Sequence, residues 1–169
     1  MDISPDVGAK YVHSAIDFPW PFKDQSVDEI ECSHYVEHIP HGDGSSDPFL
    51  QFLDEMYRVL IPVEFSPDNP NIATKGYATI VAPYYSSVLA WQDPTHLRAI
   101  SEASFLYANK EWRKTNGLDH YPVSCDFDFF YNFALNGRLA GRNPEYVGQQ
   151  VATTINAVDD IVVTLMRRP

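Results

Sequence analysis

Residues 27–40 read VDEIECSHYVEHIP, and the interpretation of this stretch decides the fold. Its first seven residues, up to Ser33, alternate weakly and predict a sheet strand that is covered on both faces. His34, Glu37 and His38 follow in an H-x-x-E-H pattern, which occurs in zinc peptidases whose two histidines lie one helical turn apart. The stretch therefore predicts either a metal-binding helix or a strand followed by a turn.

Pro40 weighs against the metal-binding helix. The residue before a proline is disfavoured in the helical region, so Ile39 is expected to end any helix here after fewer than two turns. His38 would then lie at a frayed helix end. The favoured interpretation is a strand-to-turn junction with no metal site, and a zinc hydrolase that uses His34, Glu37 and His38 is the alternative.

Length, charge and cysteine content limit the possible classes of protein. A chain of 169 residues with 44% apolar residues is long enough for one substantial core, which predicts a single domain over residues 1–169. The net charge of −11 opposes non-specific binding to nucleic acid or to an anionic membrane. Cys32 and Cys125 have no paired spacing, and no membrane span or secretory signal is indicated. The cytoplasm is the expected compartment.

Helical and strand patterns alternate along the chain. Apolar residues recur at steps of three and four from Pro48 to Leu60 and predict a helix with Asp47 as its N-cap. Further helices are expected over 101–112 and 144–158, and strands over 10–14, 27–33, 76–83, 127–135 and 161–166. Residues 62–75 contain three prolines and no periodicity, so an inserted loop is predicted there. This order predicts an α/β domain with a mostly parallel sheet and an antiparallel C-terminal edge.

Five short motifs follow one another along the chain. They are DISP at 2–5, FPWPF at 18–22, EHI at 37–39, YRVL at 57–60 and DPTHLR at 93–98. In this joint order they resemble small class I S-adenosylmethionine-dependent methyltransferases of bacteria and bacteriophages. The resemblance covers nearly the whole chain and implies a Rossmann-like methyltransferase fold that uses S-adenosylmethionine as its cofactor.

The resemblance also implies where the cofactor binds. Asp2 matches the acidic residue that accepts hydrogen bonds from the cofactor ribose. Ser14 and Ala15 match the end of the third strand, where the family commonly has an aspartate for the adenine, so Ser14 departs from the pattern. Ser33 and His34 match the end of the fourth strand, beneath the methionine part of the cofactor.

The glycine-rich turn that follows the first strand in this family has no counterpart in the sequence. Gly8, Gly42 and Gly44 do not lie between a strand and a helix, as such a turn requires. Three explanations stay open: a misassigned or N-terminally truncated start, completion of the sheet by a second chain or a second copy, or a rearranged fold. The last of these predicts a non-catalytic remnant that acts as a binding or assembly subunit.

Methyl transfer from a sulfonium needs aligned reactants and, for oxygen or nitrogen acceptors, a base. His96 is the candidate base, and Asp93 is the candidate residue that orients its ring; purely structural turn roles are the alternative for both. Tyr84, Tyr85 and Trp91 are the candidate substrate-binding residues, because aromatic faces suit a sulfonium or another cationic group. The acceptor is expected to be an uncharged or cationic molecule that the sequence does not identify.

Overall fold

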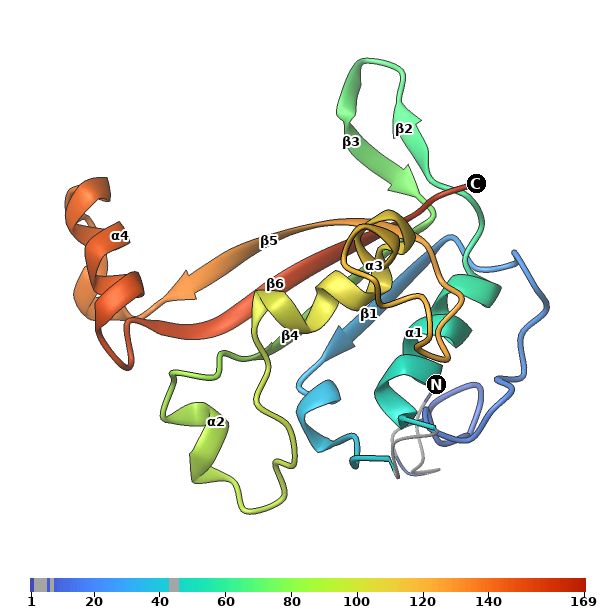
Figure 1. The fold of residues 1–169 in the computed structure, drawn as a ribbon, viewed down its shortest axis with the longest axis horizontal. Coiled ribbons are helices and arrows are strands. Elements are labelled where there is room, and N and C mark those ends of the chain that lie inside the picture. Colours follow the sequence, from blue (N-terminus) through green and yellow to red (C-terminus); the bar gives the residue numbers. More distant parts are fainter. Residues whose placement is uncertain (2–5, 7, 43–45) are drawn as a thin grey trace.

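The computed structural model describes residues 1, 6, 8–42 and 46–169, and a four-stranded sheet forms its centre (Figure 1). The strand order is β1-β4-β6-β5. These strands are β1 (Glu29–Ser33), β4 (Tyr77–Pro83), β6 (Val158–Arg167) and β5 (Phe127–Leu135). A separate two-stranded sheet, β2 (Glu64–Ser66) and β3 (Asn69–Lys75), projects from one end of the molecule.

The four-stranded sheet is mixed. β1 and β4 are parallel, and isolated parallel bridges join Val27 to Leu60 and Tyr84 to Ile100. β6 lies antiparallel between β4 and β5. The antiparallel C-terminal edge expected from the sequence is therefore confirmed, and the parallel pairing brings the carboxyl ends of β1 and β4 to the same edge.

Helices cover one face of this sheet. The helices of the described ranges are α1 (Pro48–Val59), α2 (Leu89–Gln92), α3 (Lys110–Thr115) and α4 (Pro144–Thr153), with the 3-10 helices η2 (Val36–His38), η3 (Glu102–Ala108) and η4 (Gly137–Leu139). α1 packs against η3 through Phe49 and Phe105, and against β5 through Tyr57 and Phe127. α4 lies at the far end of the β5–β6 hairpin (Figure 1). None of the helices in the described ranges is long and apolar enough to cross a membrane.

α1 forms as its sequence predicts. The Asp47 side chain accepts a hydrogen bond from the N–H of Phe49, and Pro48 occupies the first turn, where it needs no hydrogen-bond donor. The apolar stripe, which includes Leu53 and Met56, is fully buried. Burial of each such side chain stabilises the fold by about 1.5–3 kcal/mol.

β1 differs from the expectation that both of its faces are covered. Glu29, Glu31 and Ser33 are exposed, while Ile30 and Cys32 are half-buried against the core. The polar residues at alternate positions explain the difference, since successive side chains of a strand point to opposite faces. Only the face that carries Ile30 and Cys32 is packed under helices.

Two further predictions, a strand over residues 10–14 and one continuous helix over 101–112, are wrong. Residues 10–14 form no strand and contain one bridge residue, Val12. The helix expected over 101–112 is interrupted at Asn109, whose extended backbone (φ −99°, ψ 118°) ends η3. The Asn109 side chain then accepts from the Trp112 N–H and caps α3, so a capping residue in mid-segment accounts for the split.

The loop predicted over residues 62–75 is also wrong, because these residues form the β2–β3 hairpin. Ser66 pairs with Asn69 across a turn at Pro67 and Asp68. Pro70 lies on an exposed strand of a two-stranded sheet, where a missing N–H donor is tolerated. The prolines are therefore compatible with a hairpin: Pro67 lies in its turn and Pro70 on its exposed strand.

Candidate active site at the ends of β1 and β4

The candidate site begins where two parallel strands end together. Ser33 is the last residue of β1 and lies opposite Val81 of β4. The His34 N–H continues this pairing by donating to the Val81 carbonyl at 2.8 Å. In open α/β sheets, ligands bind beyond the carboxyl ends of such strands. The residues that follow β1 and β4 therefore define the site.

A short turn follows β1. His34 has a left-handed backbone with a φ of 51°, which is uncommon for a residue other than glycine. η2 then spans only Val36–His38, and Ile39 leaves it in an extended conformation with a ψ of 123°. The prediction that Pro40 prevents a longer helix is confirmed.

The segment that follows α2 packs against this turn. The backbone N–H groups of Leu97 and Arg98 both donate to the carbonyl of Glu37, at 2.8 and 3.0 Å. These two bonds hold residues 93–98 next to η2. The side chains of His38 and His96, which are far apart in the sequence, consequently lie with their ring centroids 4.7 Å apart.

Arg98 fixes the turn from the other side. Its guanidinium donates to the carbonyls of Ile39 at 2.8 Å and Pro40 at 2.6 Å, and to both carboxylate oxygens of Asp47 at 2.9 and 2.8 Å. Partial burial raises the pKa of Asp47, but hydrogen bonds from Arg98 and from the Phe49 N–H outweigh it, so the pKa lies below its usual value. Arg98 therefore joins the turn after β1 to the start of α1.

His96 and Asp93 lie close together, as the sequence predicts, with 4.0 Å between Nε2 and Oδ2. The His96 Nδ1 atom lies 3.1 Å from the carbonyl oxygen of Ala90. Since a carbonyl only accepts, Nδ1 carries the proton and Nε2 keeps a lone pair. Hydrogen bonds from the N–H and hydroxyl of Thr95, with the nearby imidazoles, lower the pKa of Asp93. The hydrogen bond that orients the His96 ring is thus the one to Ala90.

His38 has the same tautomer. Its Nδ1 lies 3.2 Å from the carbonyl oxygen of Thr95 and 3.1 Å from Thr95 Oγ1. The Thr95 hydroxyl already donates to Asp93 Oδ1 at 2.7 Å, so its oxygen accepts from His38. His38 Nδ1 is therefore protonated, and Nε2 of this ring also keeps a lone pair.

Glu37 is the buried acid of the site. It is 1% exposed, and neither of its carboxylate oxygens has a hydrogen-bond partner in the part of the chain that the structure describes. The imidazole of His34 lies beside it, with Nδ1 3.5 Å from Glu37 Oε1. Burial, together with the charge of Glu37, raises the pKa of the Cys32 thiol to about 12. Glu37, His38 and His96 each offer one ligand atom, and these atoms all lie within 4.8 Å of one another.

The three aromatic residues expected to bind substrate have different environments. Tyr84 is buried and its hydroxyl donates to Glu102 Oε2 at 3.0 Å; burial, and next this hydrogen bond, raise its pKa. Tyr85 and Trp91 are 47% and 69% exposed, and the Trp91 indole N–H donates to the Tyr85 carbonyl at 3.0 Å. Only Tyr85 and Trp91 therefore present a surface to solvent.

Of the residues expected to bind the cofactor, Asp2 lies outside the described residues. The Ser14 hydroxyl accepts a hydrogen bond from the Ile16 N–H at 3.4 Å. The Ala15 carbonyl accepts from the Trp20 indole at 3.0 Å. Between residues 8 and 28 the structure contains no strand, so this described segment supplies no glycine-rich turn between a strand and a helix opposite Ser33.

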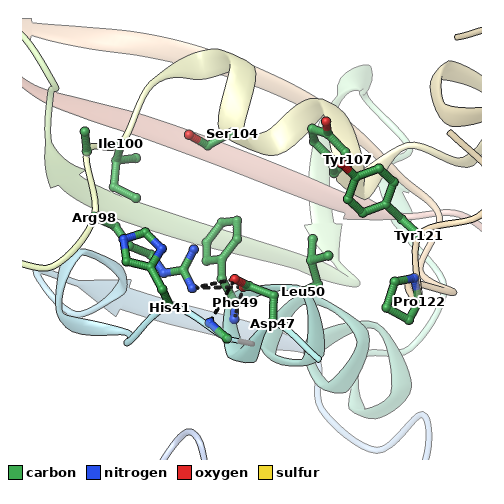
Figure 2. A pocket seen from close by; sticks show the side chains of 12 residues that line it. His41, Asp47, Phe49, Leu50, Arg98, Ile100, Ser104, Tyr107, Tyr121 and Pro122 are labelled. Atoms are coloured by element: carbon green, nitrogen blue, oxygen red, sulfur yellow. Dashed lines mark hydrogen bonds and ion pairs between the residues drawn. The ribbon is translucent and has the colours of Figure 1, made fainter. Parts of the chain in front are cut away.

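A pocket of about 380 Å³ opens beside Arg98 (Figure 2). Figure 2 shows Arg98 and Asp47 at one side of it and Tyr107 and Tyr121 at the other. None of the site residues predicted from the sequence lines this pocket. Its one guanidinium is already paired with Asp47, so the titratable cluster around His96 carries more chemistry than the pocket does.

Comparison with known proteins supports the fold. No protein-family model and no curated protein matches the sequence. Among solved structures, a SAM-dependent methyltransferase from Archaeoglobus fulgidus matches 92% of the chain with a TM-score of 0.55 and 15% identity. The chain has a methyltransferase-type fold. The small RNA methyltransferase HEN1 matches 93% of the chain with a TM-score of 0.45 and 14% identity. The chain spans 66% of the length of the first of these proteins and 16% of the second.

Proposed function

We propose that this chain transfers a methyl group from S-adenosylmethionine to an acceptor at the carboxyl ends of β1 and β4. The observation that carries the proposal is a methyltransferase-type fold with a histidine, His96, at this edge of the sheet. The cofactor would lie against Ser33 and His34, with Ser14 and Ala15 nearby and Asp2 on the ribose.

The bound cofactor supplies an electrophilic methyl group on a sulfonium. An oxygen or nitrogen of the acceptor would attack the methyl carbon as the carbon–sulfur bond breaks, the thioether form of the cofactor would leave, and the acceptor would lose a proton. His96 Nε2 takes this proton, because in the neutral ring the hydrogen bond from Nδ1–H to the Ala90 carbonyl places the lone pair on Nε2. Asp93, 4.0 Å away, stabilises the resulting imidazolium.

The acceptor in this proposal is an uncharged or cationic molecule. The net charge of −11 repels polyanions, and the exposed Tyr85 and Trp91 offer aromatic faces to a cation or a planar group. Tyr84 supports the ring of Tyr85 from the core, since the two ring centroids lie 4.6 Å apart.

A second candidate function is a binding or assembly subunit without catalysis. It is favoured by β1, which pairs only with β4 in the described sheet and leaves one edge of its backbone without a strand. A second chain or a second copy that adds a strand along β1 would complete the sheet and cover this edge.

Calorimetric titration of the purified chain with S-adenosylmethionine separates the two functions. Methyl transfer predicts saturable binding that His34→Gly weakens, because glycine keeps the left-handed backbone and removes the imidazole. The exposed His120 serves as the control, and His120→Ala is expected to bind like the wild type. No heat at millimolar cofactor would refute methyl transfer by this chain and favour the assembly subunit.

A further inference from the structure

The buried carboxylate of Glu37 is the least satisfied group of the site. It is almost fully inaccessible to water, and its oxygens make no hydrogen bond to any described residue. A carboxylate in such a place is stable only with a cation or a donor beside it. The imidazole of His34 approaches the carboxylate, but its Nδ1 lies 3.5 Å from Oε1, which is too long for a hydrogen bond.

Two imidazoles complete a set of metal-binding atoms with Glu37. His38 and His96 each donate Nδ1–H to a backbone carbonyl, which leaves Nε2 as the atom that can bind a metal. Metal-binding histidines commonly have this arrangement, in which a hydrogen bond from the other ring nitrogen fixes the tautomer and the ring orientation. The Asp93–Thr95–His38 chain of hydrogen bonds adds a carboxylate behind one ligand.

The geometry points to a binding site for one divalent transition-metal ion held by Glu37, His38 and His96. Their ligand atoms lie within 4.8 Å of one another, and a metal with bonds of about 2.0–2.2 Å would draw them to roughly 3–3.5 Å. Three protein ligands leave further positions for water or an acceptor atom, and His34 lies at the edge of the site.

The chemistry of the ligands selects the class of metal. Two imidazoles and one carboxylate suit Zn²⁺, Co²⁺, Mn²⁺ or Fe²⁺, whereas Mg²⁺ and Ca²⁺ prefer oxygen ligands. The 2+ charge of the ion compensates the buried Glu37 carboxylate and, with two neutral imidazoles, leaves the site with a net charge of +1. The site differs from the helical zinc motif of His34, Glu37 and His38, because its third ligand comes from residues 93–98.

This inference does not rest on methyl transfer, since the metal can be titrated without cofactor. It changes the role of one residue: while a metal occupies the Nε2 lone pair, His96 is a ligand and not the base. A water or an acceptor hydroxyl bound to the ion would then lose its proton more readily, as on other Lewis-acidic metal sites.

The test uses tag-free protein that has been chelated and dialysed. Co²⁺ is titrated while its visible ligand-field absorption is recorded, Zn²⁺ by calorimetry, and Mg²⁺ in a parallel arm. We expect one Co²⁺ or Zn²⁺ per chain and at least 100-fold weaker binding in Glu37→Gln and His96→Ala. His120→Ala is the matched control and is expected to bind like the wild type. Thr95→Val is expected to weaken binding by about 10–100-fold.

Thermal unfolding separates loss of the site from loss of the fold. Glu37→Gln removes a buried charge at constant shape, so the metal-free variant should be at least as stable as the metal-free wild type. Zn²⁺ at about 100 times its Kd should raise the Tm of the wild type by roughly 5–10 °C and leave the variant unchanged. Absence of stoichiometric Co²⁺ and Zn²⁺ binding, equal binding by Glu37→Gln, or equally tight binding of Mg²⁺ would each overturn the inference.

Discussion

Replacement of Arg98 by methionine tests whether one side chain holds the site together. Arg98 ties the turn after β1 to α1 through the carbonyls of Ile39 and Pro40 and both oxygens of Asp47. Methionine keeps much of the apolar stem and removes all four hydrogen bonds. The variant leaves a partly buried carboxylate and two carbonyls without this donor.

The expected loss of stability depends on how deeply Arg98 and Asp47 are buried. Breaking a fully buried ion pair costs about 3–5 kcal/mol, and hydrogen bonds to charged groups contribute about 1.5–3 kcal/mol. The Arg98 and Asp47 side chains are 12% and 28% exposed, so water replaces part of the loss. We expect Arg98→Met to lower the free energy of unfolding by about 3 kcal/mol and the Tm by roughly 6–12 °C.

Urea unfolding followed by circular dichroism measures this change. The matched control is Arg142→Met on the surface, which is expected to change stability by less than about 0.5 kcal/mol. In a double-mutant cycle with Asp47→Asn, the two changes should couple by about 1–2 kcal/mol, because the residues are in direct contact. If Arg98→Met lowers the free energy of unfolding by less than about 1 kcal/mol, Arg98 does not hold the turn after β1 against α1.

Three further predictions concern Asp47, Cys32 and Gly76. The pKa of Asp47 in the folded protein is below its unfolded value of 3.8, so the ionised carboxylate stabilises the fold above pH 3.8, and this stability is lost as the pH falls through the folded pKa. In a plot of the urea midpoint of unfolding against pH, Asp47→Asn should therefore reduce the fall of the midpoint at acid pH. Cys32, with a pKa near 12, should resist iodoacetamide at pH 8 until the protein is unfolded, as read by mass spectrometry. Gly76→Ala should cost about 2–4 kcal/mol in urea unfolding, since φ is +72° and the new Cβ would lie 2.5 Å from the Pro62 carbonyl oxygen.

The elements that sequence reasoning predicted well depend on local chemistry. α1 begins at Pro48 because Asp47 caps it, and both signals act within one helical turn. β5 has the bounds expected from its run of aromatic and apolar residues. Such signals need no knowledge of the neighbouring segments.

The predictions that were wrong concern elements whose formation depends on neighbouring segments. Residues 10–14 have the composition of a strand, but a strand forms only where another strand offers a ladder of hydrogen bonds. The hairpin over 64–75 was missed for a related reason. Three prolines exclude a central strand, but they do not exclude an exposed pair of strands with a turn at Pro67.

The sequence singled out the individual residues of the candidate site, but it did not predict which of them lie together. Glu37 and His38 stood out as a motif, and His96 stood out as a candidate base. Their meeting depends on backbone hydrogen bonds from Leu97 and Arg98 to Glu37, which no spacing within the sequence reveals. The tautomers of both histidines likewise depend on carbonyls contributed by other segments.

Pro40 weighs against a helical zinc motif in the sequence, but in the structure it favours the metal site proposed on Glu37, His38 and His96. It does prevent the long helix that a zinc peptidase needs, because η2 ends at His38. A continuing helix would, however, have used the carbonyl of Glu37 for its own hydrogen bond. The early end leaves that carbonyl free to accept from Leu97 and Arg98. The proline that argues against a metal helix thus allows a distant histidine to reach the same glutamate.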